Sequence, residues 1–144
     1  MGQGAATLRQ MRILHAVFLL SVLLIFQQAE QLAGARTRYS MVFLAAIVFV
    51  AGIDGLLALY FRRKKLLPAS EKLRRFANDT NALKEWRLST LLILTLTESI
   101  ALYGLVLRVM GASRRVSWPF FVTALILIVA WRPQLDFGSQ APDT

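Results

Sequence analysis

Four long runs of apolar residues, separated by polar segments, dominate this chain of 144 residues. A helix that crosses a bilayer needs about 20 largely apolar residues, because the hydrocarbon layer is about 30 Å thick and each residue rises about 1.5 Å. The second and third runs meet this length, the first and fourth are shorter, and Trp118 and Trp131 bracket the fourth as interfacial aromatic residues do. We therefore predict an all-α fold, a four-helix transmembrane bundle forming one domain over residues 1–144, with spans at about 9–32, 41–61, 88–109 and 116–131.

The distribution of Lys and Arg predicts the orientation of these spans, because cytoplasmic loops carry an excess of basic residues. With the N-terminus inside, twelve basic residues fall on the inner side, and five fall on the outer side, namely Arg36, Arg38, Arg108, Arg114 and Arg115. We predict that both termini are cytoplasmic and that the protein lies in a bacterial inner membrane. The basic segment 62–87 is then a cytoplasmic loop against anionic lipid headgroups. In it, we expect Pro68 to end the preceding helix, Ser70 and Glu71 to cap a short basic helix, and Thr80 or Asn81 to cap the turn leading into the third span.

The first run has a second interpretation. Its basic start, short apolar centre and the small residues Ala33, Gly34 and Ala35 also fit a cleaved secretory signal. Cleavage near residue 35 would leave three spans and move the mature N-terminus across the membrane. The four-helix prediction requires that this segment is retained.

Composition and motifs argue against several classes of function. The chain has no Cys and a single His, His15, so it lacks the residues for a disulfide, a thiolate metal site or bis-histidine haem ligation within one chain. Phosphate-binding glycine loops and the common hydrolase motifs are absent from the sequence. The net charge of +9 comes without a nucleic-acid-binding motif. We predict no enzymatic activity, no cofactor, no metal site and no nucleic-acid partner.

Two acidic residues lie deep inside the predicted spans, far from their ends, where a charged side chain is costly and marks a functional candidate. Glu98 is about 15 Å from the basic residues at either end of its span, and Asp54 lies at a similar depth between Gly52 and Gly55. Small residues allow close helix packing, so we expect Gly52 and Gly55 to bring the two acids together between the second and third spans. At least one of the acids would then keep its proton at neutral pH.

Residues 97–106, Thr-Glu-Ser-Ile-Ala-Leu-Tyr-Gly-Leu-Val, resemble the carboxylate helix of rotary ATP synthase c subunits. The order of a helix, a basic loop and an acid-bearing helix is also similar, although the repeated Gly-x-Gly pattern of that family is missing from the second span. The resemblance implies that Glu98 binds protons or ions, with Ser99 and Tyr103 nearby and Gly104 in helix packing. Thr95, one helical turn before Glu98, completes the predicted site. The longer stretch from Ala82 to Gly111 resembles a family of small bacterial four-helix membrane proteins, which implies a fold and no mechanism.

Two functions remain open from the sequence. The first is a proteolipid-like subunit that binds or passes protons or ions at Glu98. The second is a structural accessory subunit of a larger membrane complex, in which a protonated Glu98 only holds helices together, for example by bonding to Thr95. Both predict the lipid bilayer as surroundings and either a membrane-protein partner or a homo-oligomer.

Overall fold

The structure is a computed structural model that describes residues 3–32, 40–76 and 79–132. All regular elements in these ranges are helical: α1 (Gln3–Gln31), α2 (Met41–Phe61), η1 (Arg62–Leu66), α3 (Leu67–Arg75), α4 (Thr80–Val109) and α5 (Arg114–Ala130). Three helical stretches are long and apolar enough to cross a membrane, namely Ala6–Gln31, Met41–Arg75 and Thr80–Val109. The prediction of an all-α fold is confirmed for the described residues, and three of the helices have the length and composition that a membrane span needs. The fourth predicted span corresponds to α5, which has 17 residues.

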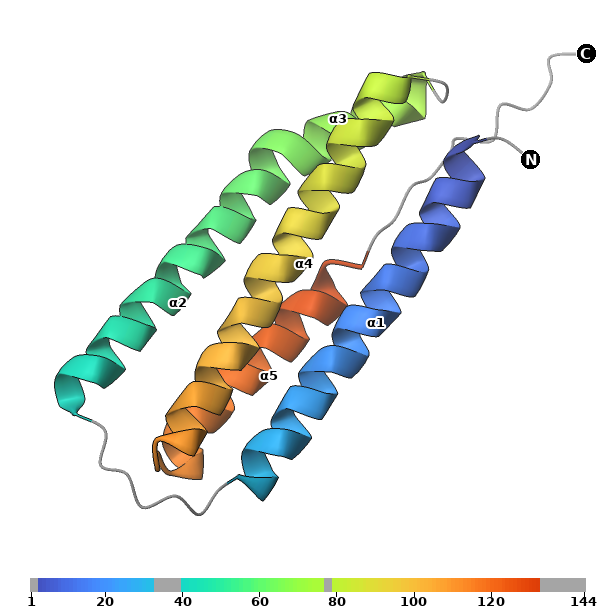
Figure 1. Cartoon of the computed structure of the whole chain (residues 1–144). Helices are drawn as coiled ribbons and strands as arrows, with labels where there is room; N and C mark the ends of the chain where they lie inside the picture. The colour runs from blue at the N-terminus through green and yellow to red at the C-terminus, as the bar shows by residue number, and fades with distance from the viewer. Residues whose placement is uncertain (1–2, 33–39, 77–78, 133–144) are drawn as a thin grey trace, which may run out of the picture.

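Helix α4 lies at the centre of the bundle, and α1, α2 and α5 pack against it (Figure 1). It has more buried residues than any other helix, including the small side chains Ala82, Ser89, Ala101 and Gly104, which allow neighbouring helices to come close. The hydroxyls of Thr90 and Thr97 are also buried, and each donates a 2.8 Å hydrogen bond to the carbonyl four residues earlier. These bonds satisfy polar atoms that would otherwise be unpaired in an apolar environment.

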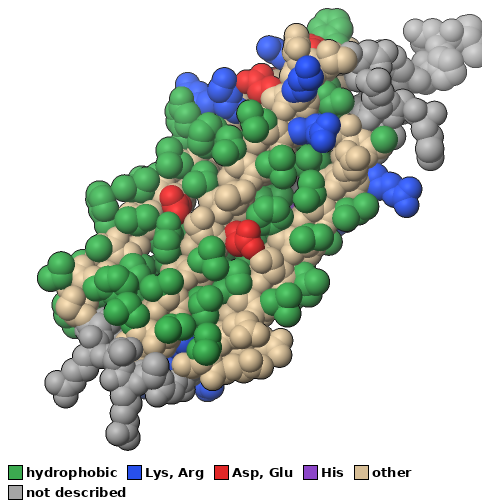
Figure 2. Space-filling view, viewed as in Figure 1, with side chains coloured by type: hydrophobic (Ala, Val, Ile, Leu, Met, Phe, Trp, Pro, Cys, Tyr) green, Lys and Arg blue, Asp and Glu red, His purple; other side chains and the backbone are tan. Residues whose placement is uncertain are grey.

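Helix α2 is mostly exposed, and Ala58 is its one fully buried residue. Its large apolar side chains, such as Phe49 at 69% and Leu56 at 68% exposure, therefore face away from the bundle. Figure 2 shows hydrophobic side chains along the length of the molecule, with Lys and Arg toward its ends. This distribution suits a chain surrounded by lipid, where apolar exposure carries no cost.

The basic segment 62–87 is mostly helical, and the expected short helix is present as α3, but it begins at Leu67, before Ser70. Helix α2 continues through the π-helical η1 into α3 without a break, and Pro68 lies in the first turn of α3 instead of ending a helix. Proline has no N–H to donate and its ring crowds the preceding turn. The wider η1 turn accommodates this, since the N–H of Leu67 bonds to the carbonyl of Arg62, five residues earlier. Residues 80–87 belong to α4.

Helix α4 begins at a cap that the sequence analysis did not select. The carboxylate of Asp79 accepts hydrogen bonds from the backbone N–H groups of Asn81, at 2.9 Å, and Ala82, at 3.0 Å. The predicted cap at Thr80 or Asn81 is therefore wrong by one or two residues. Lys65 of η1 forms a 3.2 Å ion pair with Glu85, which joins η1 to the first turns of α4.

Two buried clusters hold three helices each. In the first, Val22 of α1, Leu94 and Ala101 of α4, and Phe121 and Ala124 of α5 lie together. In the second, which lies toward the α3 end, Trp86 of α4 packs against Met11 of α1 and Leu73 of α3. A third cluster joins Ala58 of α2, Ile93 of α4 and Trp131 after α5. Every outer helix is therefore anchored on α4 through at least one of these clusters.

The turn between α4 and α5 is short because Gly111 adopts a positive φ of 86°. The N–H of Ala112 bonds to the carbonyl of Leu107, and that of Gly111 bonds to the carbonyl of Arg108. This is the Schellman arrangement, which satisfies the last carbonyls of a helix and needs a residue free to take a left-handed backbone. Helix α5 consequently folds back along α4, and its C-terminal end points toward the α3 end (Figure 1).

Candidate functional site

Glu98 lies on α4 and is half-buried against α1. Its carboxylate accepts a hydrogen bond from the hydroxyl of Ser21, 77 residues earlier in the chain. None of the described basic residues forms an ion pair with it. A carboxyl group in this position can keep a hydrogen bond to the hydroxyl in both of its protonation states. The hydroxyl donates to the carboxylate and can accept from the protonated carboxyl group.

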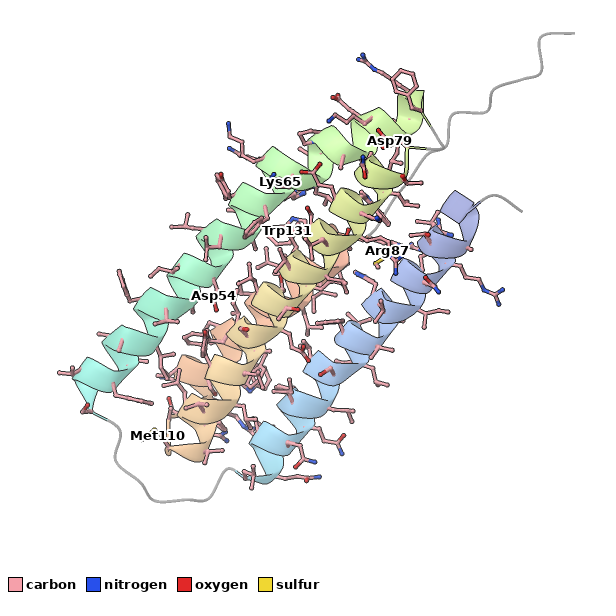
Figure 3. The ribbon with its side chains drawn as sticks, turned by 45° about the horizontal axis from the view of Figure 1, so that its top comes forward. Asp54, Lys65, Asp79, Arg87, Met110 and Trp131 are labelled. Carbon is pink, nitrogen blue, oxygen red and sulfur yellow. The ribbon has the colours of Figure 1, made fainter. Side chains whose placement is uncertain are left out.

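Asp54 lies on α2, points toward α4 and is also half-buried (Figure 3). Its carboxylate accepts a 2.8 Å hydrogen bond from the phenol of Tyr103, 49 residues later. This bond joins α2 to α4, as the bond from Ser21 to Glu98 joins α1 to α4. Both acids of the spans thus form hydrogen bonds between helices.

The two acids face different neighbours, so the expected pairing between the second and third spans does not form. Each carboxylate has its own hydroxyl partner, on α1 for Glu98 and on α4 for Asp54. Figure 2 shows acidic side chains as separate patches midway along the molecule. The other predicted site residues are less engaged: Thr95 is exposed, and Ser99 donates a 3.1 Å bond to the carbonyl of Thr95. Among the described residues, the one hydrogen bond between two side chains of the predicted set joins Asp54 and Tyr103.

The three glycines predicted to pack helices behave differently. An added Cβ at Gly104 would lie 3.0 Å from the ring of Phe121 and 3.1 Å from the Cβ of Phe120, so this glycine allows α5 to approach α4. An added Cβ at Gly52 or Gly55 would meet no atom within 4 Å. The expected close packing at Gly52 and Gly55 is therefore wrong within this chain.

A charged cluster at the turn end of the bundle was missed by the sequence analysis. Glu30 of α1 pairs with Arg114 of α5 at 2.5 Å and with Arg108 of α4 at 3.6 Å, and it accepts a 3.3 Å hydrogen bond from the indole of Trp118. The ring of Phe26 packs edge-on against both Trp118 and Phe121 beside it. One carboxylate therefore connects three helices. The clue in the sequence was an acid near the end of one apolar run and arginines flanking the ends of two others.

Ser21 was also missed, although it is the only hydroxyl residue between Ile13 and Phe26. A lone polar residue in a predicted span is a signal for a bond between helices. Its partner could not be read from the sequence, since that depends on how α1 is rotated against α4.

Comparisons of the chain with protein-family models, with curated proteins and with solved structures found no match. The site must therefore be interpreted from its own geometry. Among the described residues, no group of three or more His, Asp or Glu side chains could hold a metal ion. What the arrangement offers chemically is two carboxyl groups, each bonded to one hydroxyl, inside helices apolar enough to cross a membrane.

Proposed function

We propose that this protein is a small integral membrane subunit in which Glu98 binds and releases a proton. The observation that carries the proposal is the surroundings of Glu98: an apolar helix, one hydroxyl partner and no ion pair with a described basic residue. In hydrocarbon such a carboxyl group is stabilised by taking up a proton. The likeness of residues 97–106 to the carboxylate helix of ATP synthase c subunits supports the same role. We propose that Glu98 exchanges its proton with a membrane-protein partner or a second copy of the chain, which would contact the exposed part of its side chain.

A second candidate function is supported by the bond between Asp54 and Tyr103. This pair joins two helices without a cation and resembles Ser21 and Glu98 in its chemistry. In that case both pairs are clamps, and the protein is a structural accessory subunit. The two candidates differ in what they require of Glu98. A proton-binding subunit needs Glu98 to exchange a proton, whereas a structural subunit needs only its hydrogen bond.

Substitution of Glu98 separates these candidates. Glu98→Gln keeps the shape and hydrogen bonding of the neutral acid, whereas Glu98→Leu removes both. For a proton-binding subunit, Glu98→Gln should abolish proton flux through the assembly purified in mild detergent and placed in vesicles, while assembly is unchanged. For a clamp, Glu98→Gln should be nearly silent, and Glu98→Leu should lower the free energy of unfolding by about 1 kcal/mol, the scale of one hydrogen bond between membrane helices.

Carbodiimide labelling tests the shared premise, because the reagent attacks protonated carboxyl groups accessible from lipid. We expect Glu98 to be labelled at neutral pH. Asp54→Asn is the matched control and should leave this label in place. An infrared spectrum with an ionised Glu98 at neutral pH would contradict the proposal.

The orientation of the bundle is the next part of the proposal. Helix α1 begins, and α5 ends, toward the end where η1 and α3 place seven basic residues, namely Arg62, Arg63, Lys64, Lys65, Lys72, Arg74 and Arg75 (Figure 1). Basic residues are retained in the cytoplasm, so we propose that both termini and α3 lie on the cytoplasmic side. The chain would then cross a bacterial inner membrane four times. Anionic headgroups are then the partners of the basic segment.

A reporter fusion tests this orientation. A phosphatase that is active only outside the cytoplasm should be inactive when fused after Ser70 and active when fused after Gly111. Active enzyme after Ser70 would reverse the proposed orientation. A mature N-terminus near residue 36 would instead support the cleaved-signal interpretation.

A further inference from the structure

An apolar groove lies between α2 and α5. Its walls include Ala51, Gly52 and Gly55 of α2 and Pro119 and Thr123 of α5, and its volume is about 450 Å³. We call it the α2–α5 groove. Both helices pack against α4, while their backbones stay more than 8 Å apart between Cα atoms, so the floor of the groove is the surface of α4 at Ile100. The missing side chains of the two glycines leave this space open.

One end of the groove is closed by aromatic packing. Leu127 lines the groove and also packs against the cluster of Ala58, Ile93 and Trp131. The guanidinium carbon of Arg62 lies 5.6 Å from the centre of the Trp131 ring, which joins the end of α2 to the end of α5. A transmembrane helix, about 10 Å wide, could not follow the groove past this closure. A single hydrocarbon chain is narrower and can lie in the groove with its end at Leu127.

The opposite end of the groove carries a positive charge. Arg115 does not line the groove itself, but it lies one helical turn before Pro119, at the edge of the α5 face that does. Its side chain is exposed and forms no ion pair with a described residue, whereas the adjacent Arg114 is bound to Glu30. From Arg115 to Leu127 the helix rises about 18 Å, close to the depth of one leaflet, about 15 Å of hydrocarbon.

We propose that the α2–α5 groove binds one acyl chain of an anionic phospholipid whose phosphate group lies at Arg115. The apolar walls receive the chain, the closure at Trp131 limits its length, and the arginine provides the counterion for the headgroup. Arginine suits this role because its planar guanidinium can donate two hydrogen bonds to one phosphate. This lipid site is separate from the basic residues of η1 and α3, which lie at the other end of the bundle (Figure 1).

Lipid retention measured by native mass spectrometry tests the chain-binding part. The full-length protein is purified in mild detergent and titrated with phosphatidylglycerol. Gly55→Leu fills the groove without a clash and should weaken binding of the first lipid molecule about tenfold. Ala46→Leu is the matched control, because Ala46 is an exposed residue of α2 outside the groove, and it should bind lipid as the unmodified protein does. Equal binding by the two variants would overturn the proposal.

The headgroup part is tested by comparing phosphatidylglycerol with phosphatidylcholine. The unmodified protein and Arg63→Gln, which removes an exposed charge at the other end, should prefer the anionic lipid for this first site. Arg115→Gln should lose that preference while still binding a lipid molecule. An unchanged preference in Arg115→Gln would overturn the assignment of the phosphate. A dimer in detergent that dissociates on Gly55→Leu would assign the groove to a second copy of the chain and also overturn it.

Discussion

Trp86→Ala is expected to lower the free energy of unfolding by about 3–5 kcal/mol, the cost of removing a large aromatic side chain from a packed core. The Trp86 side chain is 1% exposed and packs against Met11, Leu73 and Ala82. These contacts hold the start of α4 to both α1 and α3. Loss of the indole leaves a cavity where three helices meet, and helix α3 has few other anchors, since Ala69 and Leu73 are its buried residues.

Trp118→Ala is the matched control for that prediction. Trp118 is 44% exposed, and its polar contact is one 3.3 Å hydrogen bond to Glu30. We expect its loss to cost about 1 kcal/mol. Both variants can be unfolded by denaturant in mild detergent and followed by circular dichroism. Similar losses for the two tryptophans would show that the cluster around Trp86 does not hold the bundle together.

Gly104→Val should also be strongly destabilising, by about 1–3 kcal/mol or enough to separate α5 from α4. A Cβ at this position would already lie 3.0 Å from the Phe121 ring and 3.1 Å from the Cβ of Phe120. Phe121 is itself buried and is packed against Phe26, so its ring has little room to move. The two helices must therefore move apart.

The control for this prediction is Gly52→Val, which makes the same chemical change in another apolar helix. No atom lies within 4 Å of a Cβ added to Gly52, so no neighbour has to move. We expect this variant to unfold at nearly the denaturant concentration of the unmodified protein. Helix separation can be followed by a pair of spin labels on exposed sites of α4 and α5. An unchanged label distance and an unchanged midpoint for Gly104→Val would contradict the packing described here.

The helices of this protein were predictable because their signal is local. A run of about 20 apolar residues in a bilayer has to satisfy its own backbone hydrogen bonds, and a helix does so within one segment. The predicted spans at 41–61 and 88–109 accordingly lie within helical stretches of the structure. The basic segment was harder, since the effect of Pro68 depends on whether the turn before it can widen, as η1 does.

The candidate site was predictable only in its residue types. Two carboxyl groups in apolar helices stand out from the sequence by their desolvation cost alone, and so Asp54 and Glu98 were found. Their partners were not: Ser21 is 77 residues from Glu98, and Tyr103 is 49 residues from Asp54. The sequence determined that each acid needs a proton or a hydrogen-bond donor. The tertiary structure decided which donor each one meets and which glycine is covered, because both depend on the rotation of each helix about its axis against α4.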